Sequence, residues 1–232
     1  MGRIKKMIKW LLGFPGAVYL GFITHLPGEC GFSLRYLYWK RRLKCLGERS
    51  RIDTGVYFQN PRYISVGENT WIDKNVIILA GLDLSKRERV TFKNQNYTFD
   101  PGHVYIGNDI HIAPNCLISG IAGGVYISDR CGFSADCKVY SFSHHFRSVQ
   151  DGSNREIYFG GMVRADQQCM ISGPVFLGQN VGVALNTVIL PGASILEDSF
   201  VAINSVVHKG RYANNSFIEG SPAKVVGERF KT

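Results

Sequence analysis

The chain has 232 residues, of which 45% are hydrophobic, and this suffices for one domain with its own core plus an appendage. Its six cysteines form no CxxC pair and no cleavable signal precedes them, which favours a reduced, cytoplasmic chain over a disulfide-linked secreted one. The whole formal charge of +9 lies in residues 1–51, which hold eleven Lys and Arg against Glu29 and Glu48. No nucleic-acid recognition motif accompanies this charge, so we expect no nucleic-acid partner.

The first segment of the chain is a basic cluster followed by an apolar stretch. Residues 10–26 contain no Lys, Arg, Asp or Glu, but three glycines and Pro15 interrupt them. A stretch of this length, broken in this way, is borderline for spanning a bilayer. We therefore expect residues 10–26 to lie in the plane of a membrane or to enter it partway.

A second segment, residues 33–46, has the pattern of a basic amphipathic helix. It places Leu34, Leu37 and Tyr38 on one side of a helix and directs Arg35 and the following arginines largely elsewhere. A helix of this kind suits an anionic membrane surface.

Together the two segments predict that residues 1–50 are a helical appendage to the main domain. We expect it to bind the inner, cytoplasmic face of the cell membrane through residues 1–46, so that the protein is peripheral to the membrane. The alternative is that both segments pack on the main domain and that their charges are only solvated.

A repeat of six residues dominates the remainder of the chain. Every sixth position carries a branched aliphatic residue or Leu, and the position four residues later carries a small or β-branched one. Upstream the same frame returns in residues 66–78, 106–118 and 127–139. The longest uninterrupted series of the aliphatic position is Leu177, Val183, Ile189, Ile195, Val201 and Val207.

A six-residue period suits a short flat strand followed by a turn, and three such units close one triangular coil. One coil cannot cover its own core, so the coils must stack. A β-sandwich would instead alternate with a period of two. The pattern therefore predicts an all-β fold, a parallel β-helix over residues 51–210, followed by a C-terminal tail at residues 211–232.

Three segments leave the repeat. Residues 79–103 form a long excursion, residues 119–126 a minor one, and residues 143–174 a third, which carries the adjacent His144 and His145. Long loops on a rigid solenoid are where proteins commonly place binding and catalytic groups. We therefore expect the functional site at these excursions.

The coils of residues 175–210, the closing motif IEGSPAKVV at 218–226 and the motif VYSFSH at 139–144 carry a family resemblance. In them the chain resembles the hexapeptide-repeat acyltransferases, and within these the polysaccharide and maltose/galactoside-type O-acetyltransferases. The resemblance implies a left-handed β-helix and a homotrimer with active sites between neighbouring subunits. It also implies an enzyme that transfers an acetyl group from acetyl-CoA to a sugar hydroxyl. The basic N-terminus favours a surface polysaccharide or a lipid-linked glycan precursor as the acceptor.

The same resemblance assigns five positions to the acyl-CoA groove, namely Leu185, Ile203, His208, Lys209 and Lys224. The two lysines suit this task because ammonium groups bind phosphates, although either could be a solvated surface charge. Leu185 and Ile203 depart from the family, which usually has a small residue where backbone amides approach the cofactor.

For catalysis the resemblance places the general base at His144, with His145 as the neighbouring candidate. Histidine as a residue type can take a proton from a hydroxyl and return it to the thiolate leaving group. Asp136, Asp151, Glu156 or a backbone carbonyl could hold the imidazole in the required tautomer. The alternative is that His144 is a hydrogen-bonded loop residue without a catalytic role.

Three other functions share parts of this pattern. N-acetylation of an amino sugar needs the same deprotonation, and a non-catalytic trimeric membrane scaffold would need only the coils. The zinc-binding branch of the fold needs three histidines that converge on one ion. The spacing of His103, His111, His144 and His145 does not supply them, so we expect no metal site.

Overall fold

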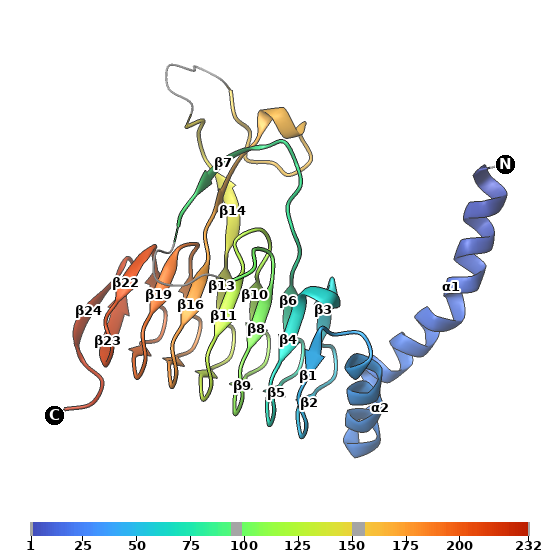
Figure 1. The fold of residues 1–232 in the computed structure, drawn as a ribbon, viewed down its shortest axis with the longest axis horizontal. Helices are drawn as coiled ribbons and strands as arrows, with labels where there is room; N and C mark the ends of the chain where they lie inside the picture. Colours follow the sequence, from blue (N-terminus) through green and yellow to red (C-terminus); the bar gives the residue numbers. More distant parts are fainter. Residues whose placement is uncertain (1, 94–98, 150–155, 232) are drawn as a thin grey trace.

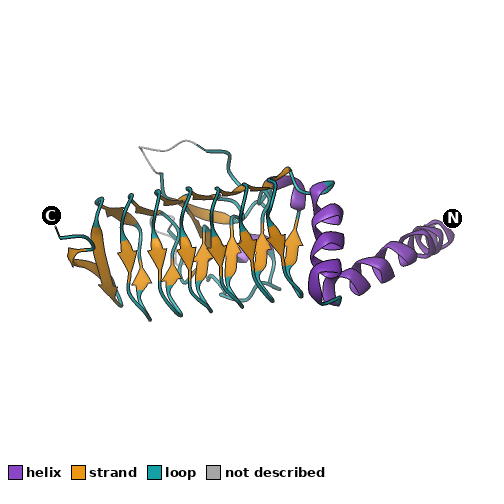
Figure 2. Cartoon of the chain, turned by 90° about the horizontal axis from the view of Figure 1, so that it is seen from below, coloured by secondary structure: helices purple, strands orange, loops and turns teal. Residues whose placement is uncertain are grey.

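The computed structural model describes residues 2–93, 99–149 and 156–231, with only the backbone described for residues 2–12. Within these residues three sheets of short strands run along the molecule and are joined into successive triangular coils (Figures 1 and 2). The strands of neighbouring coils pair in parallel, as the six-residue repeat predicts. The arrangement agrees with the left-handed β-helix expected from the resemblance.

The strands fall into three sheets, which we call first, second and third in the order in which the chain enters them. The first sheet has the order β1 (Cys45–Leu46), β4 (Ile64–Val66), β8 (Val104–Ile106), β11 (Val125–Ile127), β16 (Val175–Leu177), β19 (Ala193–Ile195) and β22 (Gly210–Tyr212). The second has β2 (Arg51–Ile52), β5 (Trp71–Ile72), β9 (His111–Ile112), β12 (Gly132–Phe133), β17 (Gly182–Val183), β20 (Phe200–Val201), β23 (Ser216–Gly220) and β24 (Ala223–Glu228). The third has β3 (Tyr57–Gln59), β6 (Ile77–Leu79), β10 (Leu117–Ser119), β13 (Lys138–Tyr140), β18 (Val188–Ile189) and β21 (Val206–Val207).

The aliphatic position of the repeat forms the core of the coils. Ile127 pairs in register with Leu177, and Val139 with Ile189, and all four side chains are buried. Side chains stacked in this way exclude water from the interior of each coil, and their burial is the main source of stability.

Asparagine and aspartate residues shape the corners between the strands. Asn180, Asn186, Asp198 and Asn204 have positive φ angles, which these residue types adopt more readily than most others. The side-chain amide of Asn180 donates to Asp198 at 2.8 Å, and that of Asn186 to Asn204 at 2.9 Å. The corners of successive coils are therefore tied together by polar ladders.

The coils extend beyond the range of residues 51–210 expected for them. At the N-terminal side β1 pairs in parallel with β4, and at the C-terminal side β22 and β23 continue the first and second sheets. Strand β24 then runs antiparallel to β23. Residues 211–220 of the expected tail thus belong to a further coil, and the tail proper closes its end.

Two helices precede the coils, α1 (Gly2–His25) and α2 (Gly28–Lys40). Helix α2 lies across the open end of the first coil, and α1 projects away from it (Figures 1 and 2). The ring centroid of Trp39 in α2 is 4.7 Å from that of Phe58 in β3, so the helix covers the core. No helix among the described residues is long and apolar enough to cross a bilayer.

The second helix buries a face that the sequence did not predict. Its buried face consists of Gly31, Arg35 and Trp39, and Arg35 is 1% exposed, whereas Leu37 is 55% exposed. The guanidinium of Arg35 donates to the backbone carbonyls of Ile52, Ile23 and Leu26 at 2.6–2.9 Å. Burial of this arginine is offset by these carbonyls, which bind its Nε and Nη1 atoms, whereas its Nη2 atom is buried without a partner among the described residues.

Two excursions from the coils combine into a small sheet of their own. Strand β7 (Glu88–Thr91) comes from residues 79–103, and β14 (Phe142–His145) and β15 (Cys169–Ser172) flank the third excursion. The order is β14-β15-β7, and the sheet stands at the corner where the third sheet passes into the first (Figure 1). Two short 3-10 helices, Pro61–Tyr63 and Ala165–Gln167, complete the described elements.

Candidate active site on the excursion sheet

The two adjacent histidines lie on strand β14 and therefore point to opposite faces of the excursion sheet. In the register of this sheet, His144 is opposite Met170 of β15, which is opposite Arg89 of β7. Residues directly opposite one another project from the same face. His144 thus shares a face with Arg89, two strands away. His145 belongs to the other face.

The imidazole of His144 is enclosed by neighbouring residues. Its Nε2 atom is buried and has no hydrogen-bond partner among the described residues. The ring centroid of Phe159 lies 5.4 Å from that of His144, and a Cβ atom placed on Gly161 would be 3.8 Å from His144 Cε1. Buried polar atoms without a partner are rare, and at a functional site they mark a place for a substrate or water.

The imidazole of His145 is engaged locally. Its Nδ1 atom lies 2.7 Å from the backbone oxygen of Arg147, and its ring stacks on Phe146 with centroids 4.8 Å apart. On its face of the sheet it lies opposite Cys169, which is opposite Glu88. Burial and the neighbouring Glu88 carboxylate both raise the pKa of the Cys169 thiol. A thiolate nucleophile is therefore disfavoured in spite of the neighbouring histidine.

The structure does not bring the expected orienting acids to His144. Asp136 occupies a corner with a positive φ angle, and Glu156 accepts a hydrogen bond from the Tyr158 hydroxyl at 2.8 Å. Between described residues, neither acid is hydrogen-bonded to His144. Asp151 lies outside the described residues.

The residues expected to hold acyl-CoA lie along both edges of the third sheet. Leu185 and Ile203 occupy successive corners between the second and third sheets and are 51% and 58% exposed. The backbone N–H of Asn204 donates to the Leu185 carbonyl at 3.0 Å, so the two corners are stacked. His208 and Lys209 lie at the opposite edge, where the third sheet leads into the first.

The two lysines occupy different elements. The Lys209 ammonium lies 4.3 Å from the ring centroid of Phe92, which follows β7. Lys224 is on β24, opposite Glu219, and is exposed. Within one subunit four of the five residues therefore flank the third sheet, and Lys224 lies on the last strand of the second sheet. Their contact with the cofactor stays a prediction.

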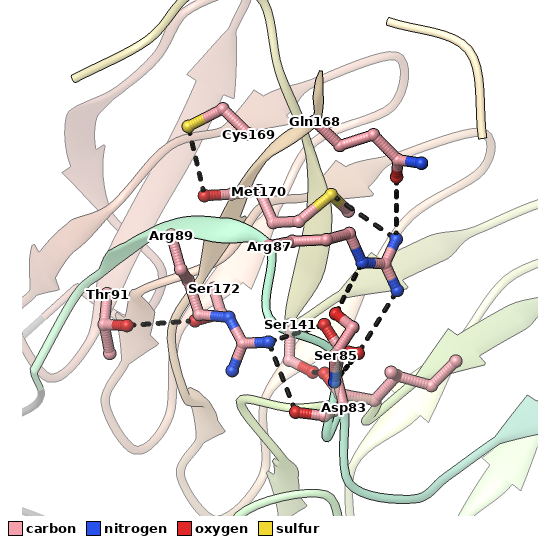
Figure 3. A network of polar contacts seen from close by, with 11 residues as sticks. Asp83, Ser85, Arg87, Arg89, Thr91, Ser141, Gln168, Cys169, Met170 and Ser172 are labelled. Carbon is pink, nitrogen blue, oxygen red and sulfur yellow. Dashed lines mark hydrogen bonds and ion pairs between the residues drawn. The ribbon is translucent and has the colours of Figure 1, made fainter. Parts of the chain in front are cut away.

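A polar cluster that the sequence did not predict joins the two excursions (Figure 3). The Asp83 carboxylate accepts hydrogen bonds from the guanidinium groups of Arg87, at 3.2 Å, and Arg89. Arg87 also donates to the side-chain oxygen of Gln168 at 3.0 Å, across to the other excursion. The two arginines are two positions apart in a polar stretch. This spacing could have predicted that they project from the same face of a strand.

Asp83 remains ionised within this cluster. Burial opposes its charge and alone would raise its pKa. Hydrogen bonds from Ser85 and the charges of Arg87 and Arg89 outweigh burial and hold the pKa of Asp83 below its ordinary value. The carboxylate thus fixes both arginines at neutral pH.

No protein-family model matches the chain. A relative named dTDP-4-amino-4,6-dideoxy-D-glucose acyltransferase, from Escherichia coli, is 29% identical over 188 residues, which cover 81% of this chain and 83% of the relative. Galactoside O-acetyltransferase of Escherichia coli K12 is 27% identical over 167 residues, which cover 72% of this chain and 64% of the relative.

Solved structures match the fold. AntD, an N-acyltransferase from Bacillus cereus in complex with dTDP and 3-hydroxybutyryl-CoA, has a TM-score of 0.64 and 20% identity, over 84% of this chain and 88% of AntD. A hexapeptide-repeat acetyltransferase of Vibrio cholerae complexed with acetyl-CoA has a TM-score of 0.52 and 19% identity, over 90% of this chain and 82% of the other.

These relatives and the stacked coils together confirm the predicted class of protein. The chain is an acyltransferase homologous to enzymes named for the acylation of sugars, and it resembles the hexapeptide-repeat acyltransferases. The solved structures agree with its β-helix.

Proposed function

We propose that the chain transfers an acetyl group from acetyl-CoA to a sugar, with His144 as the general base. The observation that carries this proposal is the buried Nε2 atom of His144, for which the described part of the chain supplies no hydrogen-bond partner. In the reaction Nε2 takes the proton of the attacking group as that group bonds to the thioester carbonyl. The carbon–sulfur bond then breaks, and the imidazolium returns its proton to the leaving thiolate. No covalent enzyme intermediate is needed.

For the acceptor we place the amine of a nucleotide-linked amino sugar first and a sugar hydroxyl second. The relative named for an amino-sugar nucleotide matches over a larger share of both chains than the galactoside O-acetyltransferase does. This reverses the order that the sequence alone favoured. The hydroxyl remains the second candidate, on a surface polysaccharide or a lipid-linked glycan precursor, because the same proton transfer serves either nucleophile.

An assay with defined acceptors tests the proposed function. The purified chain is incubated with acetyl-CoA and either dTDP-4-amino-4,6-dideoxyglucose or a galactoside. Release of free CoA and the acetylated product are then measured by thiol titration and mass spectrometry. Acetylation of the amine supports our first acceptor, and acetylation of the hydroxyl supports the second. A chain that binds no acyl-CoA and releases none with either acceptor would be the non-catalytic scaffold.

The lysines are expected to act on the donor. We propose that Lys209 and Lys224 contact the phosphates of CoA, because both are exposed cations near the C-terminal end of the coils. Lys209→Ala or Lys224→Ala should raise the KM for acetyl-CoA with little change in kcat. A lost charge-assisted contact of about 1–2 kcal/mol corresponds to roughly a 5- to 30-fold increase. Lys74→Ala, on an exposed corner of an early coil, is the matched control. Unchanged CoA binding by calorimetry in both variants would contradict the assignment.

We also propose that the working form is a homotrimer, in which CoA lies between subunits. The outward row of the third sheet supports this, because it is largely apolar along its whole length. Its members in register are Tyr57, Ile77, Leu117, Lys138, Val188 and Val206. Dilution that dissociates the trimer in light scattering should abolish acetyl transfer at the same concentration. A fully active monomer would refute this prediction.

Membrane attachment remains a proposal that rests on charge and exposure. The basic cluster precedes an α1 surface on which Phe14, Val18 and Phe22 are exposed. The intact chain should sediment with anionic liposomes, less so at high salt, and a chain lacking residues 1–16 should remain in the supernatant. This cut retains Leu20 and Ile23, which pack against α2 and the first coil. Equal sedimentation of both chains would contradict attachment through this segment.

A further inference from the structure

Two buried polar atoms without partners share one face of the excursion sheet. Among the described residues, Nε2 of His144 and Nε of Arg89 are both buried and make no hydrogen bond. The register places the two residues in one row, with Met170 between them. Unsatisfied buried groups are costly, so two in one row indicate that a ligand supplies the missing partners.

The neighbouring Arg87 differs from Arg89 because each of its three guanidinium nitrogens donates a hydrogen bond. Its Nε donates to the Ser85 hydroxyl at 2.6 Å, one terminal nitrogen to Gln168 at 3.0 Å and the other to Asp83 at 3.2 Å. With described residues, Arg89 bonds through Nη2 alone, which donates to the carboxylate and the backbone oxygen of Asp83 (Figure 3). Arg87 therefore stabilises the contact between the two excursions, whereas Arg89 has N–H donors that can bind another group.

The charge on this face favours an anion. Among the residues that the structure describes, the two guanidinium groups pair with one carboxylate, that of Asp83, so one positive charge is left. Glu88, the acid next in sequence, projects from the opposite face with Cys169. On the face of Arg89 the hydroxyls of Thr91 and Ser172 lie 3.4 Å apart and add further polar groups.

We propose that Arg89 binds a phosphate or diphosphate carried by the sugar acceptor and so presents the sugar to His144. This inference rests on the proposed function and names the chemistry of its acceptor. Neighbouring strands are about 4.8 Å apart, so residues two strands apart are separated by roughly 10 Å. A hexose with a phosphate at its far end can bridge that separation. A planar guanidinium also suits phosphate oxygens, which it can bind through two donors at once.

Phe159 and Gly161 cover the His144 imidazole, so access to it requires a small movement of these residues. The Phe159 ring that lies against His144 is 66% exposed. Gly161 adds no side chain to the cover. A sugar could therefore displace Phe159 without disturbing the coils beneath.

Binding of inorganic pyrophosphate to the intact protein tests this site. Titration calorimetry is performed with saturating CoA, so that the CoA phosphate site is filled. Arg89→Gln should weaken pyrophosphate binding at least about tenfold, the loss of one charge-assisted contact, and Arg89→Lys should retain part of the affinity. Arg164→Gln is the matched control, because Arg164 is an exposed arginine of the third excursion that pairs with Asp166. The melting temperature and CoA affinity of each variant verify its folding.

The proposal is overturned if pyrophosphate binds the Arg89→Gln variant as tightly as it binds the unchanged protein. It is also overturned if pyrophosphate binds to neither protein. In the acetyl-transfer assay, pyrophosphate should compete with a phosphorylated acceptor, which separates acceptor recognition from binding of free phosphate. If the Arg89→Gln variant acetylates the acceptor with an unchanged KM and the His144→Ala variant does not acetylate it, the proposed function stands and the anion site fails. If no acceptor is acetylated by the unchanged protein, the proposed function fails.

Discussion

Replacing His144 with Ala should lower kcat for acetyl transfer by about two to four orders of magnitude, the usual contribution of a positioned acid–base group. The imidazole Nε2 is the buried, unpaired nitrogen on the face that we assign to the acceptor. Its backbone is held by pairing between β14 and β15, which should persist in the variant. Folding, assembly and acetyl-CoA binding are therefore expected to remain, and steady-state kinetics with calorimetry would measure each.

His145→Ala is the internal control for this prediction. His145 projects from the opposite face and is engaged with the Arg147 carbonyl, so its loss should cost little activity. A large loss in His145→Ala together with normal turnover in His144→Ala would move the base to the other face. Normal turnover in both variants would exclude general-base catalysis by this strand.

The coils could be predicted from sequence because residues close together in the chain define the repeat, and the repeat places the same residue type at the same position of each coil. Ile189, Ile195 and Val201 recur at a fixed spacing, and each position is buried for the same reason in every coil. The corner residues follow the same rule, since Asn and Asp recur where φ is positive. A period repeated along the chain needs no knowledge of distant contacts.

The excursion sheet could not be predicted in the same way. Glu88 pairs with Cys169, eighty-one residues later in the chain, and neither segment carries the repeat. The position of His144 at a functional loop was predicted from the resemblance, but its place within a strand follows from that distant pairing. The role of Arg89 follows only from the register. Sequence spacing alone does not tell which faces of β7 and β14 coincide.

Helix α2 shows a different limit, because its sequence pattern does not tell which of its faces is buried. The sequence pattern placed Arg35 away from Leu34, Leu37 and Tyr38 but gave no sign that it is buried, and burial of a charge is costly. At Arg35 that cost is offset by three backbone carbonyls, those of Ile23 in α1, Leu26 between the two helices and Ile52 in β2. These acceptors exist only after folding, so the sequence could not reveal them.

Arg35→Met should therefore be among the most destabilising substitutions in the chain. Met fills much of the same space but leaves the carbonyls of Ile23, Leu26 and Ile52 without their donor. Buried acceptors deprived of a charged donor each cost about 1–3 kcal/mol, and water entering the junction would recover part of this. We expect the free energy of unfolding to fall by about 2–4 kcal/mol in urea titrations at fixed protein concentration.

Arg42→Met is the control for this prediction. Arg42 follows the same helix, is exposed and lies over the Tyr38 ring at 3.6 Å. Its replacement should change the free energy of unfolding by less than about 1 kcal/mol, as for most surface positions. Arg35→Lys should be intermediate, because one ammonium cannot match the fixed fork of the guanidinium. If Arg35→Met unfolds at the same urea concentration as the unchanged chain, the three carbonyls are satisfied by water, and α2 is held to the first coil by Trp39 and its apolar neighbours alone.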